Sequence, residues 1–276
     1  MYTLIESLDD LAFLNKELLL KEYVGVDTEF RRTNKDNMKL ALLQVKDEEE
    51  IYLIDTLAIE NPNEHVSFLF SNSLIKIFHS CKEDLEAIYA WSKKEMINIF
   101  DTQLANSFLG DDYSISYQGL VEKRLDINLE KKETRSNWMR RPLTDDQLKY
   151  AALDVEYLIE LYLIQKDELF ETNKLKWHNQ EIEKIINNTF HLHSTYSESE
   201  RVLSKAKESE LLLNFNNIIK KISKREGINS TLLFSKKLQK DFLRLIYDKG
   251  LDIALNELTE WRATLIENDL LELIKE

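Results

Sequence analysis

Two carboxylates at the end of an apolar segment constrain this chain more than any other feature. Residues 23–26 are largely apolar and β-branched, which favours a strand in the protein core. Side chains alternate between the two faces of a strand, so the acids that follow, Asp27 and Glu29, point to the same side. Two anions on one face repel each other unless a cation holds them, and carboxylate oxygens suit Mg²⁺ or Mn²⁺. Two solvated acids at a strand end are the alternative.

A further acid, Asp84, follows another apolar segment, residues 74–79, which predicts a second strand. Ser80 and Glu83 have the spacing of a capping box, so a helix is predicted to start there. Asp84 then lies in the first helical turn at a strand-to-helix junction, where sites of α/β proteins often form. On its own, an acid at this position is also explained by the helix dipole.

The segment 143–158 holds a tyrosine and a fourth acid. Thr144 and Gln147 have the spacing of another capping box, which predicts a helix start. Tyr150 and Asp154 are four residues apart, so they are neighbours on one helical face. A core aromatic with its hydroxyl at the surface is the alternative for Tyr150.

These segments together resemble the DEDD 3′–5′ exonucleases, and among them ribonuclease D. The resemblance is carried by three motifs in the family's order: Asp27-Thr28-Glu29-Phe30, Asp84, and Tyr150 with Asp154, the tyrosine-bearing subtype. Residues 100–105 and 134–144 also resemble stretches typical of ribonuclease D. The similarity extends over residues 2–163.

The resemblance implies an α/β fold, a ribonuclease-H-like mixed sheet flanked by helices. It implies two divalent cations, Mg²⁺ or Mn²⁺, held by four acids: Asp27, Glu29, Asp84 and Asp154. Tyr150 would orient the attacking water, since a phenol with a pKa near 10 is a weak base. We expect a 3′–5′ exoribonuclease that releases nucleoside 5′-monophosphates from the 3′ ends of tRNA precursors or other structured RNA. The alternatives are a 3′–5′ DNA exonuclease and a catalytically weak nucleic-acid-binding factor.

Six side chains are candidates for contact with the nucleic acid: Phe30, Gln44, His79, Arg135, Trp138 and Arg141. The two aromatic residues either stack on bases or belong to the core. We expect Gln44 to lie on a second strand and to face the terminal nucleotide. The alternative for His79 is a structural role, with its ring hydrogen-bonded within the protein. The arginines are phosphate candidates because a guanidinium is planar and always charged. We expect Asp101 to be a helix cap or a supporting group and not a metal ligand.

The charge of the chain is divided between its two ends. The 276 residues carry a net charge of −13, of which residues 1–200 hold −15 and residues 201–276 hold +2. A nuclease with such an acidic part must depend on its metals and a few local arginines. The single cysteine, Cys81, excludes an intrachain disulfide and a cysteine-rich zinc site. Without a long apolar run or a signal-peptide pattern, the expectation is a cytoplasmic protein that does not span a membrane. We also expect a monomer.

The expected organisation has three parts: a catalytic domain at 1–172, a connecting helix and linker at 173–200, and a helical domain at 201–276. Apolar residues at helical spacing in the last part predict four or five short helices, with Gly227 and Gly250 as helix stops. This part resembles the HRDC domain of helicases and ribonuclease D, and residues 201–249 carry +7. A helical cap that packs on the catalytic domain is the alternative. Ribonuclease D usually carries two such domains, and this sequence has room for one.

The predicted strands are residues 22–30, 39–46, 51–55, 74–79 and 97–100. The predicted helices are residues 8–20, 82–92, 101–109, 117–125, 144–170 and 175–188, followed by a loop at 191–200.

Overall fold

The chain forms two compact units. The computed structural model describes residues 1–34, 37–129, 136–191 and 204–275. Unit 1 comprises residues 1–104 and 115–167, and unit 2 comprises residues 105–114 and 168–276. The connecting helix predicted at residues 175–188 is therefore part of unit 2. Residues 105–114, which the sequence analysis placed in the catalytic domain, are also part of unit 2. Within the described residues, no helix combines the length and the apolar character needed to cross a membrane.

Unit 1 is built on a six-stranded mixed sheet with the strand order β1-β4-β3-β2-β5-β6. The strands are β1 (Tyr2–Ile5), β2 (Tyr23–Asn34), β3 (Asn37–Lys46), β4 (Ile51–Ile54), β5 (Ile75–Phe78) and β6 (Ile99–Asp101). Strand β3 is antiparallel to both of its neighbours, and the other pairs are parallel. The predicted mixed sheet is confirmed. β1 was missed because its four residues form an edge strand with only Ile5 buried.

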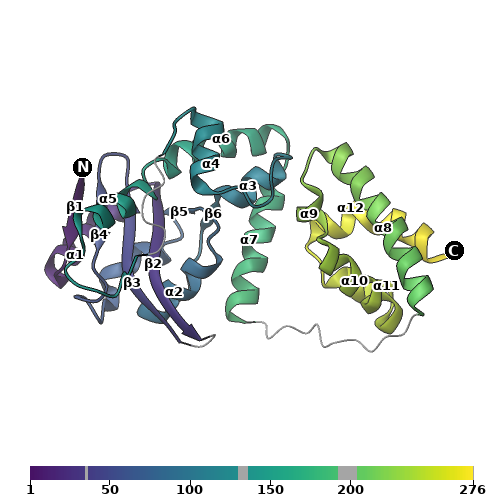
Figure 1. Ribbon diagram of the computed structural model, residues 1–276, viewed down its shortest axis with the longest axis horizontal. Coiled ribbons are helices and arrows are strands. Elements are labelled where there is room, and N and C mark those ends of the chain that lie inside the picture. Colours follow the sequence, from purple (N-terminus) through teal and green to yellow (C-terminus); the bar gives the residue numbers. More distant parts are fainter. Residues whose placement is uncertain (35–36, 130–135, 192–203, 276) are drawn as a thin grey trace. The chain divides into compact units, whose positions relative to one another are not determined.

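The central strands β2 and β3 form a long hairpin that reaches past the shorter strands (Figure 1). Residues 40–47 are buried throughout, which fits the apolar run 40–43, whereas residues 31–34 of β2 are largely exposed. The β2–β3 register shifts between Glu29 and Phe30, where Ala41 of β3 is the extra residue of a β-bulge. A bulge bends the strand that contains it and disrupts the pairing there, so the regular pairing of β2 with β3 is interrupted just after the two acids of the first motif.

The helices of this part of the chain are α1 (Leu8–Leu18), η1 (Asn63–Phe70, a 3₁₀ helix), α2 (Lys82–Ser92), α3 (Thr102–Phe108), α4 (Tyr117–Leu125), α5 (Asp145–Leu153) and α6 (Leu158–Glu171). The capping box of Thr144 and Gln147 at the start of α5 is confirmed. The single helix predicted at 144–170 is wrong, because the chain breaks between α5 and α6. The Tyr157 N–H donates to the Tyr117 hydroxyl at 2.9 Å and not to a helical carbonyl. No glycine or proline marks this break in the sequence.

The start of α2 also differs from its prediction. Ser80 has a positive φ of 69°, and Cys81 precedes the helix without a side-chain cap. The Asp101 carboxylate of β6 accepts the N–H groups of Ser80 and Cys81 at 3.1 and 2.8 Å. It also accepts the N–H groups of Gln103 and Leu104 at the start of α3. The capping-box prediction for Ser80 is therefore wrong, and the prediction of Asp101 as a helix cap is confirmed.

Unit 2 is helical. Its helices after α6 are α7 (Leu175–Phe190), α8 (Lys205–Glu226), α9 (Ser230–Leu233), α10 (Lys236–Lys249), α11 (Leu251–Asn256) and α12 (Glu260–Lys275). Three buried phenylalanine rings, Phe215, Phe234 and Phe242, lie with centroids 5.1–6.2 Å apart in its core. Gly227 and Gly250 end α8 and α10 with positive φ, as predicted. The resemblance of residues 201–276 to an HRDC domain stays a prediction.

Candidate active site

Strand β2 carries the first two acids. Val24 and Val26 are 0% exposed and anchor the strand in the core, whereas Asp27 and Glu29 are only partly buried. Asp27 lies opposite Gln44 of β3, and the bulge follows directly after Glu29. The two acids therefore lie on one face of β2, where the strand leaves the regular sheet.

Asp84 comes from the first turn of α2, and it is 7% exposed. The hydroxyl of the buried Thr28 donates a hydrogen bond to Asp84 Oδ1. Thr28 points to the opposite side of β2 from Asp27 and Glu29 because strand side chains alternate. Strand β2 thus holds the third acid through its other face. This contact was not predicted, because its two partners lie 56 residues apart in the sequence.

Asp154 and Tyr150 lie at the carboxyl end of α5. The Asp154 N–H donates to the Tyr150 carbonyl at 3.2 Å, which keeps the two residues on one helical face as predicted. The tyrosine hydroxyl and the carboxylate also affect each other's ionisation: the hydroxyl lowers the pKa of Asp154, and the carboxylate raises the pKa of Tyr150. The ring of Trp138 lies 6.2 Å from the ring of Tyr150, centroid to centroid, and supports it from one side.

The four acids are close enough to affect one another's ionisation. Burial and then the charges of Asp84, Asp154 and Glu29 raise the pKa of Asp27 well above its ordinary value. Burial and then the charges of Asp154 and Asp84 raise the pKa of Glu29 to about 8. Burial raises the pKa of Asp84 and of Asp154 to about 7, although the hydroxyl of Thr28 opposes the effect on Asp84 and that of Tyr150 opposes it on Asp154. The sequence motifs that predicted a common site are therefore brought together.

The donor set fits divalent cations of the Mg²⁺ or Mn²⁺ type. All four groups are carboxylates, and cations would balance the buried charges that repel one another. In the conformation described, no three His, Cys, Asp or Glu side chains of the described residues already form a metal-ligand set. A cation would therefore have to draw the carboxylates together.

Tyr150 is suited to donating a hydrogen bond and not to accepting a proton. Burial and then the charges of Asp154, Glu29 and Asp27 raise the pKa of its hydroxyl above the ordinary value. The hydroxyl therefore keeps its proton at neutral pH. This state matches the orienting role that the family resemblance implies.

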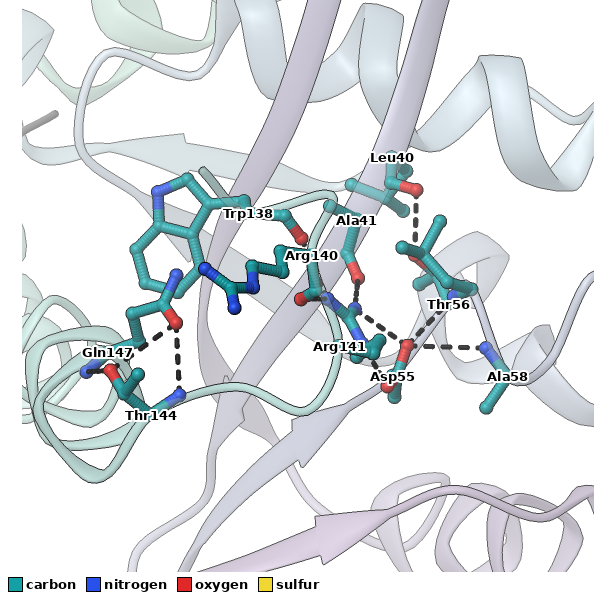
Figure 2. Close-up of polar contacts among 11 residues, drawn as sticks. Leu40, Ala41, Asp55, Thr56, Ala58, Trp138, Arg140, Arg141, Thr144 and Gln147 are labelled. Carbon is teal, nitrogen blue, oxygen red and sulfur yellow. Dashed lines mark hydrogen bonds and ion pairs between the residues drawn. The ribbon is translucent and has the colours of Figure 1, made fainter. Parts of the chain in front are cut away.

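Arg141, predicted as a phosphate contact, is engaged within the protein (Figure 2). Its guanidinium forms a two-pronged ion pair with Asp55, which is 3% exposed. It also donates to the carbonyls of Ala41 at 2.7 Å, Trp138 at 2.7 Å and Arg140 at 2.9 Å. Although burial opposes the effect, the Arg141 hydrogen bond and charge hold the pKa of Asp55 below its ordinary value. The geometry favours a role in fixing the segment before α5 against β3 and β4.

The other predicted substrate contacts differ in their exposure to solvent and in their hydrogen bonds within the protein. Gln44 is 0% exposed and Trp138 is 7% exposed, so the structure places both in the interior. His79 uses both ring nitrogens, at 2.9 Å from the Thr102 hydroxyl and 2.9 Å from the Ile115 carbonyl. This favours the structural alternative for His79. Phe30 is partly exposed just beyond the bulge, and Arg135 lies outside the described residues.

Comparison with known proteins places the chain in a family. Residues 2–169 match the family model of the 3′–5′ exonuclease domain. The chain belongs to the 3′–5′ exonuclease family. Among the relatives of this chain, ribonuclease D of Shewanella sp. is 40% identical over 160 residues, which are 58% of this chain and 41% of the relative. Ribonuclease D of Haemophilus influenzae is 41% identical over 152 residues, 55% of this chain and 38% of the relative. The matched part of the chain thus spans less than half the length of these curated relatives.

Solved structures share the fold of this chain. The crystal structure of Escherichia coli RNase D, described as an exoribonuclease involved in structured RNA processing, has a TM-score of 0.65 at 22% identity. That match covers 100% of this chain and 74% of the other. Brucella melitensis NrnC with bound Mg²⁺ has a TM-score of 0.56 at 21% identity, over 67% of this chain and 90% of that one. At these identities the likeness bears on the fold alone.

Proposed function

We propose that the chain is a metal-dependent 3′–5′ exoribonuclease that shortens structured RNA, such as tRNA precursors, from the 3′ end. The observation that carries the proposal is the convergence of four acids and a protonated tyrosine from three separate segments. A binding protein has no need of four neighbouring acids whose pKa values are all raised by burial, and for Asp27 and Glu29 also by the charges of the others. The products would be nucleoside 5′-monophosphates.

Asp27, Glu29, Asp84 and Asp154 would hold the cations. When bound, two divalent cations balance the carboxylates and stabilise the attacking and leaving oxygens of an in-line displacement. The hydroxyl of Tyr150, which lies on the same helical face as Asp154, would orient the water that attacks the terminal phosphodiester.

The preference for RNA rests on the relatives that are called ribonuclease D. No described side chain has been assigned to a 2′-hydroxyl, which is the group that distinguishes RNA from DNA. The same proposal includes that the protein acts on RNA 3′ ends in the cytoplasm.

The test is an assay on matched RNA and DNA oligomers that carry a label at the 5′ end, with Mg²⁺ or Mn²⁺. A ladder of products shortened one nucleotide at a time from RNA is expected, with mononucleotides released. Asp154→Asn and chelation by EDTA should both abolish it, and a circular RNA should stay intact.

Two outcomes would contradict the proposal. Equal or faster shortening of DNA would favour a DNA exonuclease. Binding of RNA without cleavage of either polymer, at any Mn²⁺ concentration, would favour a nucleic-acid-binding factor.

A further inference from the structure

Gln44 of β3 is a buried amide without a described partner. Its side chain is 0% exposed, and neither Nε2 nor Oε1 has a hydrogen-bond partner among the described residues. Buried polar groups are nearly always hydrogen-bonded, so each exception requires an explanation. An apolar side chain of similar size would fill the same space without leaving two polar atoms unpaired.

The register of the sheet shows which polar group lies beside this amide. Gln44 is directly opposite Asp27 of β2 on one side and Leu53 of β4 on the other. Residues directly opposite in an antiparallel pair share a face, with Cβ atoms about 4.5–5.5 Å apart. Leu53 is fully buried and apolar. Asp27 is therefore the one polar side chain among the two cross-strand partners of Gln44.

The length of the side chains allows contact across the two strands. A glutamine amide reaches two carbons beyond its own Cβ, and an aspartate carboxylate reaches one. Glu29 is the diagonal neighbour on the same face, at the larger spacing of about 7–8 Å that diagonal pairs have. Asp27 is thus the nearer of the two acids to which the amide could donate a hydrogen bond.

We propose that Gln44 is a positioning residue whose side-chain amide donates to the Asp27 carboxylate when the metal site is loaded. The hydrogen bond fixes the orientation of this carboxylate and leaves its other oxygen for the cation. Groups that hold a metal ligand in this way commonly affect metal affinity 10–100-fold. The inference rests on the proposed function, because it assigns Asp27 to a metal. Contact of Gln44 with the terminal nucleotide is disfavoured, because no part of the side chain reaches solvent.

The proposal predicts two opposite effects of one substitution, Gln44→Leu. In the metal-free protein, Gln44→Leu removes two unpaired buried atoms, so the unfolding temperature should rise by about 2–4 °C. In the metal-loaded protein, the same change removes the support of Asp27, so Mn²⁺ should bind about tenfold more weakly. The loss of Mn²⁺ affinity separates this role from packing alone, because a glutamine kept only for packing would not affect metal binding.

A second buried glutamine supplies a matched control. Gln165 of α6 is also 0% exposed, and its Oε1 also has no partner among the described residues, but its Nε2 donates to the Thr102 carbonyl at 3.0 Å. Gln165→Leu should lower the unfolding temperature, because it removes a hydrogen bond that is present, and it should leave Mn²⁺ affinity unchanged. If Gln44→Leu does not fold, Gln44→Met takes its place, because a methionine side chain is flexible and similar in volume to glutamine.

The measurements are thermal unfolding in EDTA and Mn²⁺ titration by calorimetry, on the full chain and its three variants. Higher stability with weaker Mn²⁺ binding in the Gln44 variant supports the proposal. Wild-type Mn²⁺ affinity in that variant overturns it while leaving the proposed function intact. Failure of the unsubstituted protein to bind Mn²⁺ overturns the metal site itself, and the inference with it.

Discussion

At the scale of single residues, the family resemblance indicated which acids form the candidate site, but not what surrounds them. The D-x-E pattern required only strand alternation to place Asp27 and Glu29 on one face. The hydroxyl of Thr28 on Asp84 depends on packing between β2 and α2, which no local pattern encodes. The complete burial of Gln44 depends on how the sheet is covered, so the sequence placed it facing a nucleotide.

The raised pKa values predict how the stability of the metal-free protein varies with pH. In the folded state Glu29 titrates near 8, and Asp84 and Asp154 near 7, whereas in the unfolded chain acids titrate near 4. Between pH 5 and 7 the folded protein therefore binds more protons than the unfolded chain, and its stability should fall as pH rises. His79, whose pKa burial lowers, opposes this trend but is outnumbered. Lys76, whose pKa burial lowers to about 7, acts mainly above this window.

Thermal unfolding in EDTA at pH 5, 6 and 7 measures this dependence. The unfolding temperature of the unsubstituted protein should decrease across the series, and Mg²⁺ should restore it at pH 7. Asp154→Asn, which removes one titrating acid, should make the decrease shallower. A rise in unfolding temperature from pH 5 to 7 would show that the acids are not crowded as described.

At the scale of helices and strands, periodicity predicted the existence of elements better than their ends. Residues 82–92 and 117–125 form helices over the predicted ranges, because each begins and ends with a change in polarity. The break at 154–157 was missed because no glycine or proline marks it. There the N–H groups of Glu156 and Leu158 donate to carbonyls three residues earlier, and the N–H of Tyr157 donates to the Tyr117 hydroxyl. The start of α2 was misassigned because its N–H acceptor, Asp101, comes from another strand.

The ion pair of Asp55 and Arg141 joins elements that are 86 residues apart in the sequence. Asp55→Asn should lower the free energy of unfolding by about 1.5–3 kcal/mol, because it leaves a guanidinium in a buried setting without its charged partner. It should also lower the exonuclease rate, since Arg141 binds the carbonyl of Trp138, the residue that supports Tyr150. Urea unfolding and a single-turnover assay measure the two effects.

The control for this substitution is an exposed ion pair in the same unit. The carboxylate of Glu83 lies 3.5 Å from Arg32 Nη2 and is 65% exposed. Glu83→Gln should change the free energy of unfolding by less than about 1 kcal/mol and leave the rate unchanged. Equal effects of Asp55→Asn and Glu83→Gln would mean that the Asp55–Arg141 pair does not hold the segment before α5.

At the scale of the whole molecule, charge is distributed unevenly along the chain. Residues 1–200 carry −15, whereas residues 201–249 carry +7. An acidic catalytic part repels a polyanion beyond the reach of its metals. The lysines of unit 2 are therefore the side chains best suited to attract RNA. Lys236, Lys237 and Lys240 occupy the amino-terminal half of α10, and all three are exposed.

Replacing these three lysines of α10 by alanine should weaken RNA binding without affecting the chemistry. For each lysine that binds a phosphate, its replacement should reduce the slope of log affinity against log salt concentration by about 1. Binding of a long RNA, measured between 50 and 200 mM salt with EDTA present, tests this, and hydrolysis of a dinucleotide should proceed at the unsubstituted rate. The control replaces three exposed lysines of unit 1: Lys16, Lys94 and Lys166. If both triple variants keep the full salt slope, then unit 2 does not bind the RNA backbone through α10, and other residues of the chain must bind it.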